Sequence, residues 1–275
     1  MTETTALRLA GGDALALLHR ISTNALADLT PGQCRATLFC DFRGRLLHRA
    51  VVGVGSDGAL WLFRDDAPGA ELAAFLDRHV FRDDVRIEDR SHELPVAVAA
   101  GGAAPAPGAM TERAGIPTAV LAPDDEALTL GAQAPAADDE ARTRQRILAG
   151  RPGHGHEIVE TFTPFEVGLA HEVHLDKGCY TGQETLMRLV TYQSVKRRLA
   201  RVEGPGAVPA PPADLTAEGR PAGILTRAVR DGAGWIGLAV IRNDACEAGH
   251  PLEIAGGGRT EPPEPLPARR PLGRG

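Results

Sequence analysis

The 275-residue sequence predicts an α+β protein with several subdomains and a small all-β domain near its C-terminus. Apolar residues at helical spacing follow Asp13, which is typical of an amphipathic helix. Two strand-like runs then flank a tight turn at residues 41–44. Short β-like runs follow a stretch rich in Pro and Gly at 204–212. Together these observations favour an α+β fold.

The N-terminal elements are a helix and a strand hairpin. The helix begins at Asp13, an N-cap residue, and its apolar stripe consists of Leu15, Leu17, Leu18 and Ile21. The hairpin strands are residues 33–39 and 46–54. The turn Asp41-Phe42-Arg43-Gly44 joins them, with Gly at the position that needs an unusual φ. A turn of this kind is commonly a solvated tip, because Asp and Gly favour turns for backbone reasons.

Shorter elements follow, interrupted by loops of Gly, Ala and Pro. The loose stretches are 99–107 and 132–137, which indicates a trimmed subdomain carried on long loops. The predicted strands are 60–63, 85–88, 118–121 and 127–130, and the predicted helices are 69–80 and 138–148. The last helix has acidic residues in its first turn, arginines later and Gly150 after its end, as the helix dipole and a C-cap favour.

The octapeptide Lys177-Gly178-Cys179-Tyr180-Thr181-Gly182-Gln183-Glu184 carries the richest chemistry in the chain. Its two glycines permit φ > 0, so a tight turn that presents Cys179 and Tyr180 is expected. An ammonium at Lys177 favours the reactive thiolate form of a nearby cysteine. Gln183 and Glu184 offer the donors and acceptors that suit the edge of a pterin or purine. The competing interpretation is a glycine-flanked turn with a packed Cys and solvated charges.

Charged residues on both sides of the octapeptide extend this candidate site. Glu166 and Glu184 would place two carboxylates near a thiol. Arg188 is suited to a carboxylate tail, because guanidinium binds carboxylate through two hydrogen bonds, although a surface arginine is the alternative. A strand predicted at 193–202 carries a basic stripe, which suits a polyglutamate tail, an acidic partner or simply a solvated face.

A cluster of histidines raises the question of a metal site. They are His154, His156, His171 and His174, with Cys179 close behind. His171 and His174 would share one face of a helix, but the segment is rich in Gly, Pro and Thr. We therefore expect loop-packed or solvated histidines and no metal.

The C-terminal part predicts a small β domain and a tail. The strands are expected at 222–228, 235–241 and 252–254. Residues 256–275 are dominated by Pro, Gly and Arg, which is typical of disorder.

Composition narrows the class of protein. Hydrophobic residues make up 43% of the chain, enough for a core, and aromatic residues only 4%. The net charge of −6 gives no sign of a nucleic-acid binder. No apolar run reaches the length of a membrane span, and no signal-peptide core is present, so we expect a cytoplasmic protein. Four cysteines without a C-x-x-C pair argue against a disulfide scaffold and a tetrathiolate zinc site.

The octapeptide resembles the signature of the YgfZ family of folate-binding proteins, relatives of the glycine cleavage T-protein. The surrounding landmarks are similar to that family in their order, and the resemblance extends with gaps from about residue 7 to about residue 252. The landmarks are Arg151-Pro152-Gly153-His154-Gly155-His156-Glu157, Phe162-Thr163-Pro164-Phe165-Glu166-Val167-Gly168-Leu169 and Lys196-Arg197-Arg198-Leu199.

The resemblance implies a multi-subdomain fold of the T-protein and YgfZ type with a central folate channel and a small C-terminal β-barrel. Residues 1–203 would form the folate-binding domain, with subdomains of about 1–90 and 91–203. Residues 204–255 would form the barrel, and 256–275 the disordered tail.

The resemblance also implies roles for individual residues. Cys179 would be the functional thiol, assisted by Lys177. The residues that would face tetrahydrofolate or a one-carbon derivative are Tyr180, Gly182, Gln183, Glu184, Arg188, Glu166 and Asp41, with Arg43 beside the last.

The function implied is that of a tetrahydrofolate-binding accessory protein that supports assembly or repair of iron–sulfur clusters. Its partners would be client iron–sulfur proteins, including radical enzymes that modify tRNA, or cluster-assembly factors. Direct contact with nucleic acid or membrane is not expected. One alternative is a folate-dependent aminomethyltransferase like the T-protein, which needs a positioned carboxylate and no Cys. Another is a non-catalytic scaffold for protein interactions whose ligand site has decayed.

Overall fold

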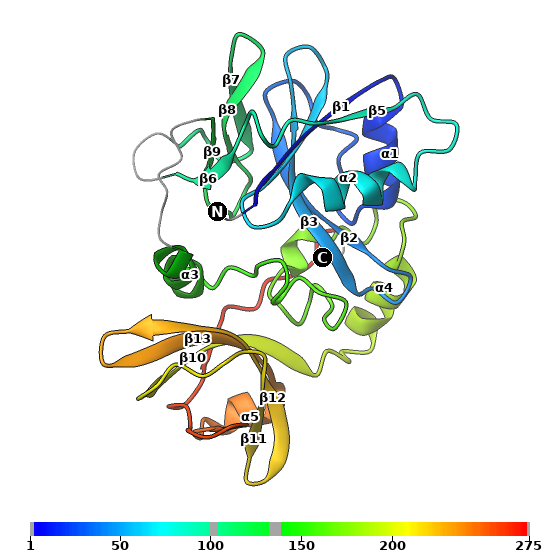
Figure 1. Cartoon of the computed structure of the whole chain (residues 1–275). Helices are drawn as coiled ribbons and strands as arrows, with labels where there is room; N and C mark the ends of the chain where they lie inside the picture. Colours follow the sequence, from blue (N-terminus) through cyan, green and yellow to red (C-terminus); the bar gives the residue numbers. More distant parts are fainter. Residues whose placement is uncertain (1–2, 100–103, 132–138, 274–275) are drawn as a thin grey trace.

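The computed structural model describes residues 3–99, 104–131 and 139–273. Within them the strands form three antiparallel sheets of five, four and six strands. Figure 1 shows the five-stranded and four-stranded sheets at one end of the molecule and the six-stranded sheet at the other. Helix α3 and the long loop that follows it lie between the two ends. The α+β class is confirmed.

The five-stranded sheet has the order β2-β3-β4-β1-β5, and the predicted hairpin forms its first pair. Its strands are β1 Thr5–Ala10, β2 Cys34–Cys40, β3 Leu46–Val54, β4 Leu60–Arg64 and β5 Arg86–Asp89. Helix α1 (Ala14–Ile21) begins directly after its N-cap Asp13, as predicted. Helix α2 (Gly69–Asp77) ends earlier than the predicted residue 80. Both helices pack on one face of the sheet, where Leu17, Leu72 and Phe39 are buried in a common core.

The four-stranded sheet has the order β6-β9-β8-β7 and packs against the first sheet. Its strands are β6 Val96–Val98, β7 Ala109–Arg113, β8 Ile116–Leu121 and β9 Leu128–Leu130. The predictions at 118–121 and 127–130 are confirmed by β8 and β9, whereas β6 and β7 were not predicted. Trp61 and Phe63, stacked at 6.2 Å, join the two sheets in one core. The loose stretch predicted at 132–137 and part of the one at 99–107 lie outside the described residues.

The segment between the two ends contains three short helices: α3 Asp139–Leu148, the 3₁₀ helix η1 Ala170–Glu172 and α4 Gln183–Thr191. The predicted start of α3 at Asp138 lies outside the described residues, and Gly150 after it has φ 63°, as a C-cap requires. Phe162, Leu186 and Leu238 belong to one buried core, so the loop is packed against both the hairpin and the last sheet.

The six-stranded sheet has the order β14-β11-β12-β13-β10-β15. Its strands are β10 Arg197–Pro205, β11 Ala213–Ala217, β12 Arg220–Asp231, β13 Gly234–Arg242, β14 Glu253–Ile254 and β15 Glu264–Pro265, and helix α5 spans Asn243–Ala248. The strands predicted at 222–228, 235–241 and 252–254 correspond to β12, β13 and β14. The predicted domain boundary between residues 203 and 204 lies within β10.

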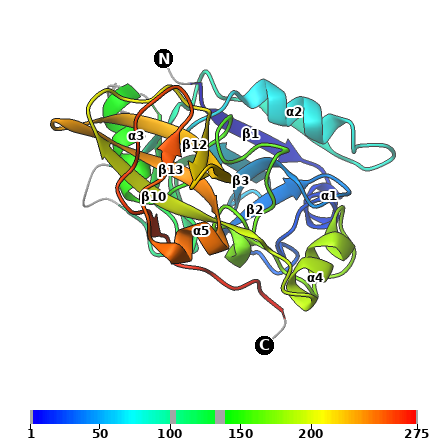
Figure 2. The ribbon, with the colours of Figure 1, turned by 90° about the horizontal axis from the view of Figure 1, so that it is seen from below.

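The C-terminal segment differs from the disordered tail predicted from residue 256. Strand β15 pairs with β10, and further on Leu272 N donates to Val173 O at 2.8 Å while Leu272 O accepts from Leu175 N at 3.0 Å. Figure 2 shows this red segment leaving the six-stranded sheet toward the side that carries α4. Hydrogen bonds to distant parts of the chain hold this segment in place, although its composition is typical of disorder. Residues 274–275 lie outside the described residues.

No helix in the described part of the chain is both long and apolar enough to cross a bilayer.

Candidate functional site

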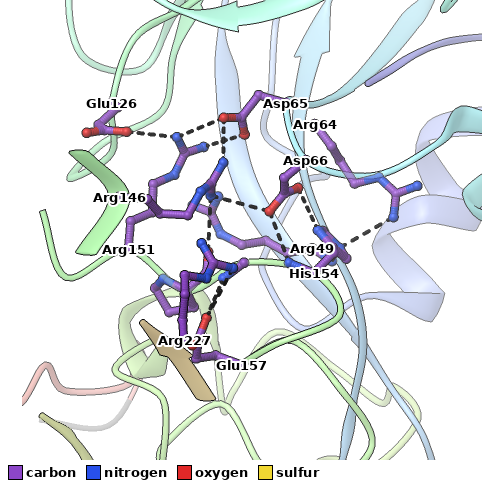
Figure 3. A network of polar contacts seen from close by, with 12 residues as sticks. Arg49, Arg64, Asp65, Asp66, Glu126, Arg146, Arg151, His154, Glu157 and Arg227 are labelled. Carbon is purple, nitrogen blue, oxygen red and sulfur yellow. Dashed lines mark hydrogen bonds and ion pairs between the residues drawn. The ribbon is translucent and has the colours of Figure 1, made fainter. Parts of the chain in front are cut away.

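A small cavity, with room for about one water molecule, lies where the two N-terminal sheets meet the loop after α3. Its walls are mostly charged, and Figure 3 shows the side chains directed toward one another across it. The charged lining residues are Arg49 of β3, Arg64 at the end of β4, Asp65 and Asp66 directly after it, Arg146 of α3, and Arg151 and His154 of the following loop.

Arg49 connects β3 to two other parts of the chain. Its guanidinium donates to both oxygens of Glu172 in η1, the shortest at 2.6 Å, and to Asp125 Oδ2 at 2.8 Å in the β8–β9 turn. All three side chains are at most 10% exposed. Burial alone would raise the pKa of Asp125, but Arg49 and Arg151 outweigh it and lower that pKa to about 2. Asp125 is therefore ionised at neutral pH.

Two aspartates after β4 form the second part of the network. Asp65 accepts from Arg146 at 2.6 Å and from Arg151 at 3.1 Å. Asp66 accepts from His154 Nδ1 at 2.7 Å. Because His154 Nε2 accepts from the backbone N–H of Arg49 at 3.1 Å, the ring proton belongs on Nδ1. Burial would raise the pKa of Asp66, yet His154 and Arg146 hold it well below its usual range.

Arg64 differs from the other cavity arginines because none of its hydrogen bonds within the described residues reaches a carboxylate. It donates to Thr5 Oγ1 and to the carbonyl of Pro68, and its Nη1 lies 3.3 Å from His48 Nδ1. Burial lowers the pKa of Arg64 to about 10 and, with Arg64 beside it, that of His48 to about 3. His48 is thus neutral. Arg64 is a buried cation with no carboxylate among its hydrogen-bond partners, and the charges of Asp66 and Glu71 act on it from farther away.

A further pair connects the cavity region to the six-stranded sheet. Arg227 of β12 lies 3.6 Å from Glu157, which also accepts from the backbone N–H of Gly153 at 3.0 Å. A Cβ on Gly153 would lie 2.2 Å from the Arg227 guanidinium, so a larger residue would displace the arginine. Figure 3 shows Arg227 and Glu157 directly below the aspartate network.

The cavity is too small for a folate. The free space among its lining side chains holds about one water molecule, whereas ligand sites typically have ~300–1,000 Å³. Both of its aspartates are already paired, Asp65 with Arg146 and Arg151, and Asp66 with His154. The residues that line it therefore do not fit a pterin head.

The octapeptide forms a separate surface turn on the far side of the hairpin. Gly178 and Gly182 have φ of 104° and 84°, as predicted. A Cβ on Gly182 would lie 2.5 Å from the carbonyl oxygen of Asp41, and Thr185 Oγ1 lies 3.4 Å from Phe42 O. The predicted neighbourhood of the octapeptide and the hairpin turn is therefore present.

The side chains of the octapeptide point in different directions. Cys179 is exposed, whereas Tyr180 is buried, and burial raises its pKa. Gln183 Nε2 donates to the carbonyl of Leu175 at 2.8 Å, which supports the turn. Glu184 pairs with Arg188 at 2.6 Å on the exposed face of α4. No residue of this group lines the cavity.

Glu166 and Asp41 support local structure. Glu166 accepts from the backbone N–H of Thr163 at 2.9 Å and from Arg197 Nε at 2.7 Å. Asp41 Oδ1 accepts from the backbone N–H groups of Arg43 and Arg45, at 2.8 and 2.7 Å, and so closes the hairpin turn. Arg43 is exposed at this tip.

The four histidines that are clustered in the sequence contact different residues in the structure. His156 Nδ1 lies 3.0 Å from Thr226 O, and His174 Nδ1 accepts from Asp176 N at 3.2 Å. His171 Nε2 lies 3.6 Å from Glu172. Across residues 3–99, 104–131 and 139–273 no three His, Cys, Asp or Glu side chains are grouped as metal ligands would be.

Sequence reasoning did not identify the cavity residues as a site. Two signals were present: Arg49 interrupts an apolar strand, and Arg64, Asp65 and Asp66 follow directly after another. A charge within a strand that is buried on both faces requires a partner. The sequence does not reveal that partner, because Arg49 pairs with Glu172, which is 123 residues away along the chain.

Comparisons with known proteins agree with this architecture. Residues 196–268 match the family model described as the CAF17 C-terminal beta-barrel domain. The chain is 36% identical over 111 residues to a chloroplastic protein of Arabidopsis thaliana named as a transferase. It is 31% identical over 123 residues to the aminomethyltransferase of Caldanaerobacter subterraneus subsp. tengcongensis. These matches cover 40% and 42% of this chain, but only 26% and 31% of those proteins.

A solved structure extends the likeness to the whole chain. The glycine cleavage system aminomethyltransferase T from Bartonella henselae aligns over 98% of this chain and 85% of its own, with a TM-score of 0.74 and 14% identity. The predicted T-protein fold with a small C-terminal β domain is confirmed. In fold and in part of its sequence, the chain is similar to the glycine cleavage T-protein superfamily.

Proposed function

We propose that this protein is a tetrahydrofolate-binding accessory protein of the YgfZ type that supports assembly or repair of iron–sulfur clusters in client enzymes, including radical enzymes that modify tRNA. The observation that carries the proposal is Cys179, exposed on a glycine-flanked turn of a T-protein fold. A thiol presented in this way can meet a partner protein.

The other three cysteines are not accessible to a partner protein. Cys34, Cys40 and Cys246 are buried, and burial raises the pKa of all three, that of Cys34 to about 12. A thiol that stays protonated inside a core is a poor nucleophile and a poor metal ligand. Among the four thiols, Cys179 is therefore the candidate for contact with a client or its cluster.

The charged cavity is not the folate site in this proposal, because it has room for about one water molecule and both of its aspartates are already paired. The proposed contact with tetrahydrofolate is the turn of the octapeptide, where the Glu184 carboxylate is exposed. Bound tetrahydrofolate would supply a carrier of one-carbon units.

An aminomethyltransferase is the second candidate, because a sequence relative carries that name. That reaction needs a carboxylate free to orient the reacting amine. In the cavity Asp65 is held by two arginines and Asp66 by His154 and Arg146. Neither carboxylate is free for that role, which favours the accessory function.

Complementation tests the proposal. The chain is expressed in a bacterium that lacks its own folate-dependent iron–sulfur maintenance protein, and the activity of an iron–sulfur enzyme is measured. Restored activity is the expected result. Restored glycine cleavage in a strain without T-protein, and no rescue of the iron–sulfur enzyme, would instead favour the transferase.

A further inference from the structure

Lys177 is an unusual cation in this chain. Lysines occupy only two positions, Lys177 and Lys196, and every other basic residue apart from histidine is arginine. Lys196 is exposed, whereas Lys177 is half-buried. The amine of Lys177 is therefore placed in an environment that an ordinary surface lysine avoids.

The partners of the Lys177 amine are neutral. Nζ donates to the carbonyl oxygen of His19 at the end of α1 and lies 5.1 Å from the centre of the Tyr180 ring. The backbone of Lys177 meets the same helix, since its carbonyl oxygen lies 3.2 Å from His19 Nε2. No carboxylate in the described residues forms an ion pair with Lys177. Burial without such a pair lowers the pKa of Lys177 to about 8.

Two neighbouring titratable groups, His19 and Tyr180, supply no negative charge that would stabilise the ammonium of Lys177. His19 has its pKa lowered by burial and by Lys177, so it is neutral near pH 7. Tyr180 is protonated, because burial raises its pKa. The adjoining backbone is open: Gly178 and Cys179 are exposed, and a Cβ placed on Gly178 would meet nothing within 4 Å. The segment directly after Lys177 is thus exposed to solvent.

We propose that Lys177 is a nucleophilic amine that takes a small aldehyde to form an imine. The Nζ lone pair attacks the carbonyl carbon and forms the C–N bond, while the carbonyl oxygen takes a proton to give a carbinolamine. Loss of that hydroxyl with a proton releases water and leaves the C=N bond. No oxidant or reductant is needed, and the reaction reverses by hydrolysis.

The surroundings favour an aldehyde over an acyl donor or carbon dioxide. A protonated imine keeps a positive charge next to the Tyr180 ring and an N–H that can donate to the carbonyl of His19. An amide would lose that charge. A carbamate would place an anion in a half-buried position that faces a carbonyl oxygen and the face of an aromatic ring.

Reductive methylation tests the inference on the wild-type protein. The folded chain is treated with limiting formaldehyde and cyanoborohydride, and methylation at Lys177 and Lys196 is followed by peptide mass spectrometry between pH 6 and 10. At pH 7 about one in ten amines of pKa ~8 is neutral, against roughly one in 2,500 at pKa ~10.4. We expect at least about tenfold faster methylation of Lys177, after allowance for its partial burial, with a half-maximal rate near pH 8.

Equal or faster methylation of Lys196 overturns the inference, because the exposed lysine is the internal control in the same molecule. Rapid acetylation of Lys177 without formaldehyde adduct formation also overturns the assignment to aldehydes. Lys177→Arg must remove the adduct while leaving methylation of Lys196 unchanged. The experiment contains no folate, so its result is independent of whether the proposed folate site exists.

Discussion

Replacing Arg49 by methionine is expected to lower the free energy of unfolding by about 3–5 kcal/mol, the cost of leaving a buried charge unpaired. Arg49 is the main partner of Glu172, whose side chain is 3% exposed, and one of two partners of Asp125. Without the guanidinium, Glu172 keeps only a contact of 3.6 Å with His171. The loss would also loosen the contact between β3, η1 and the β8–β9 turn.

Unfolding in urea followed by circular dichroism measures this effect. Arg242→Met is the matched control, because Arg242 pairs with Asp244 at 2.7 Å while both side chains are more than half exposed. An exposed pair of this kind contributes little to stability. The double variant Arg49→Met/Glu172→Gln should recover part of the loss. An Arg49→Met protein as stable as the Arg242→Met protein would show that the cluster does not hold the subdomains together.

Replacing Cys179 by alanine is expected to abolish rescue of the iron–sulfur enzyme while leaving the fold intact. Cys179 is exposed, so the change removes a thiol and creates no cavity. Thr181→Ala is the matched control, since Thr181 is exposed on the same turn. Its rescue should equal that of the wild type, and the urea midpoints of both variants should be unchanged.

Full rescue by Cys179→Ala would contradict the accessory function as stated, because no other cysteine is exposed among the described residues. The transferase or the scaffold would then be the better interpretation. Loss of rescue in both variants would point to the shape of the turn and not to its thiol.

The local elements were predictable because their causes are local. Helix α1 begins directly after Asp13, Gly44 takes φ 71° in the hairpin turn, and Gly182 takes φ 84° before α4. Each of these depends on a few adjacent residues. The same reasoning led to the octapeptide as a surface turn, and the exposure of Cys179 agrees with it.

The charged cavity was not predictable in the same way. From the sequence, Arg151 is only part of a family landmark and Asp65 and Asp66 have no role, because nothing near them in the sequence reveals that they meet. The C-terminal segment shows the same limit. Its Pro- and Gly-rich composition indicates disorder, yet Leu272 pairs with Val173 and Arg269 lies 3.3 Å from Asp124. The charged cavity and the C-terminal segment both depend on contacts between residues that are far apart in the sequence.

Calorimetric titration with tetrahydrofolate tests the central claim most directly. The wild type is compared with Glu184→Ala and Cys179→Ala, two exposed positions of the octapeptide. We predict micromolar binding by the wild type, about −8 kcal/mol, weakened in Glu184→Ala, which removes a carboxylate from the proposed folate-facing turn, and kept in Cys179→Ala. Absence of binding by the wild type would contradict the folate-binding function.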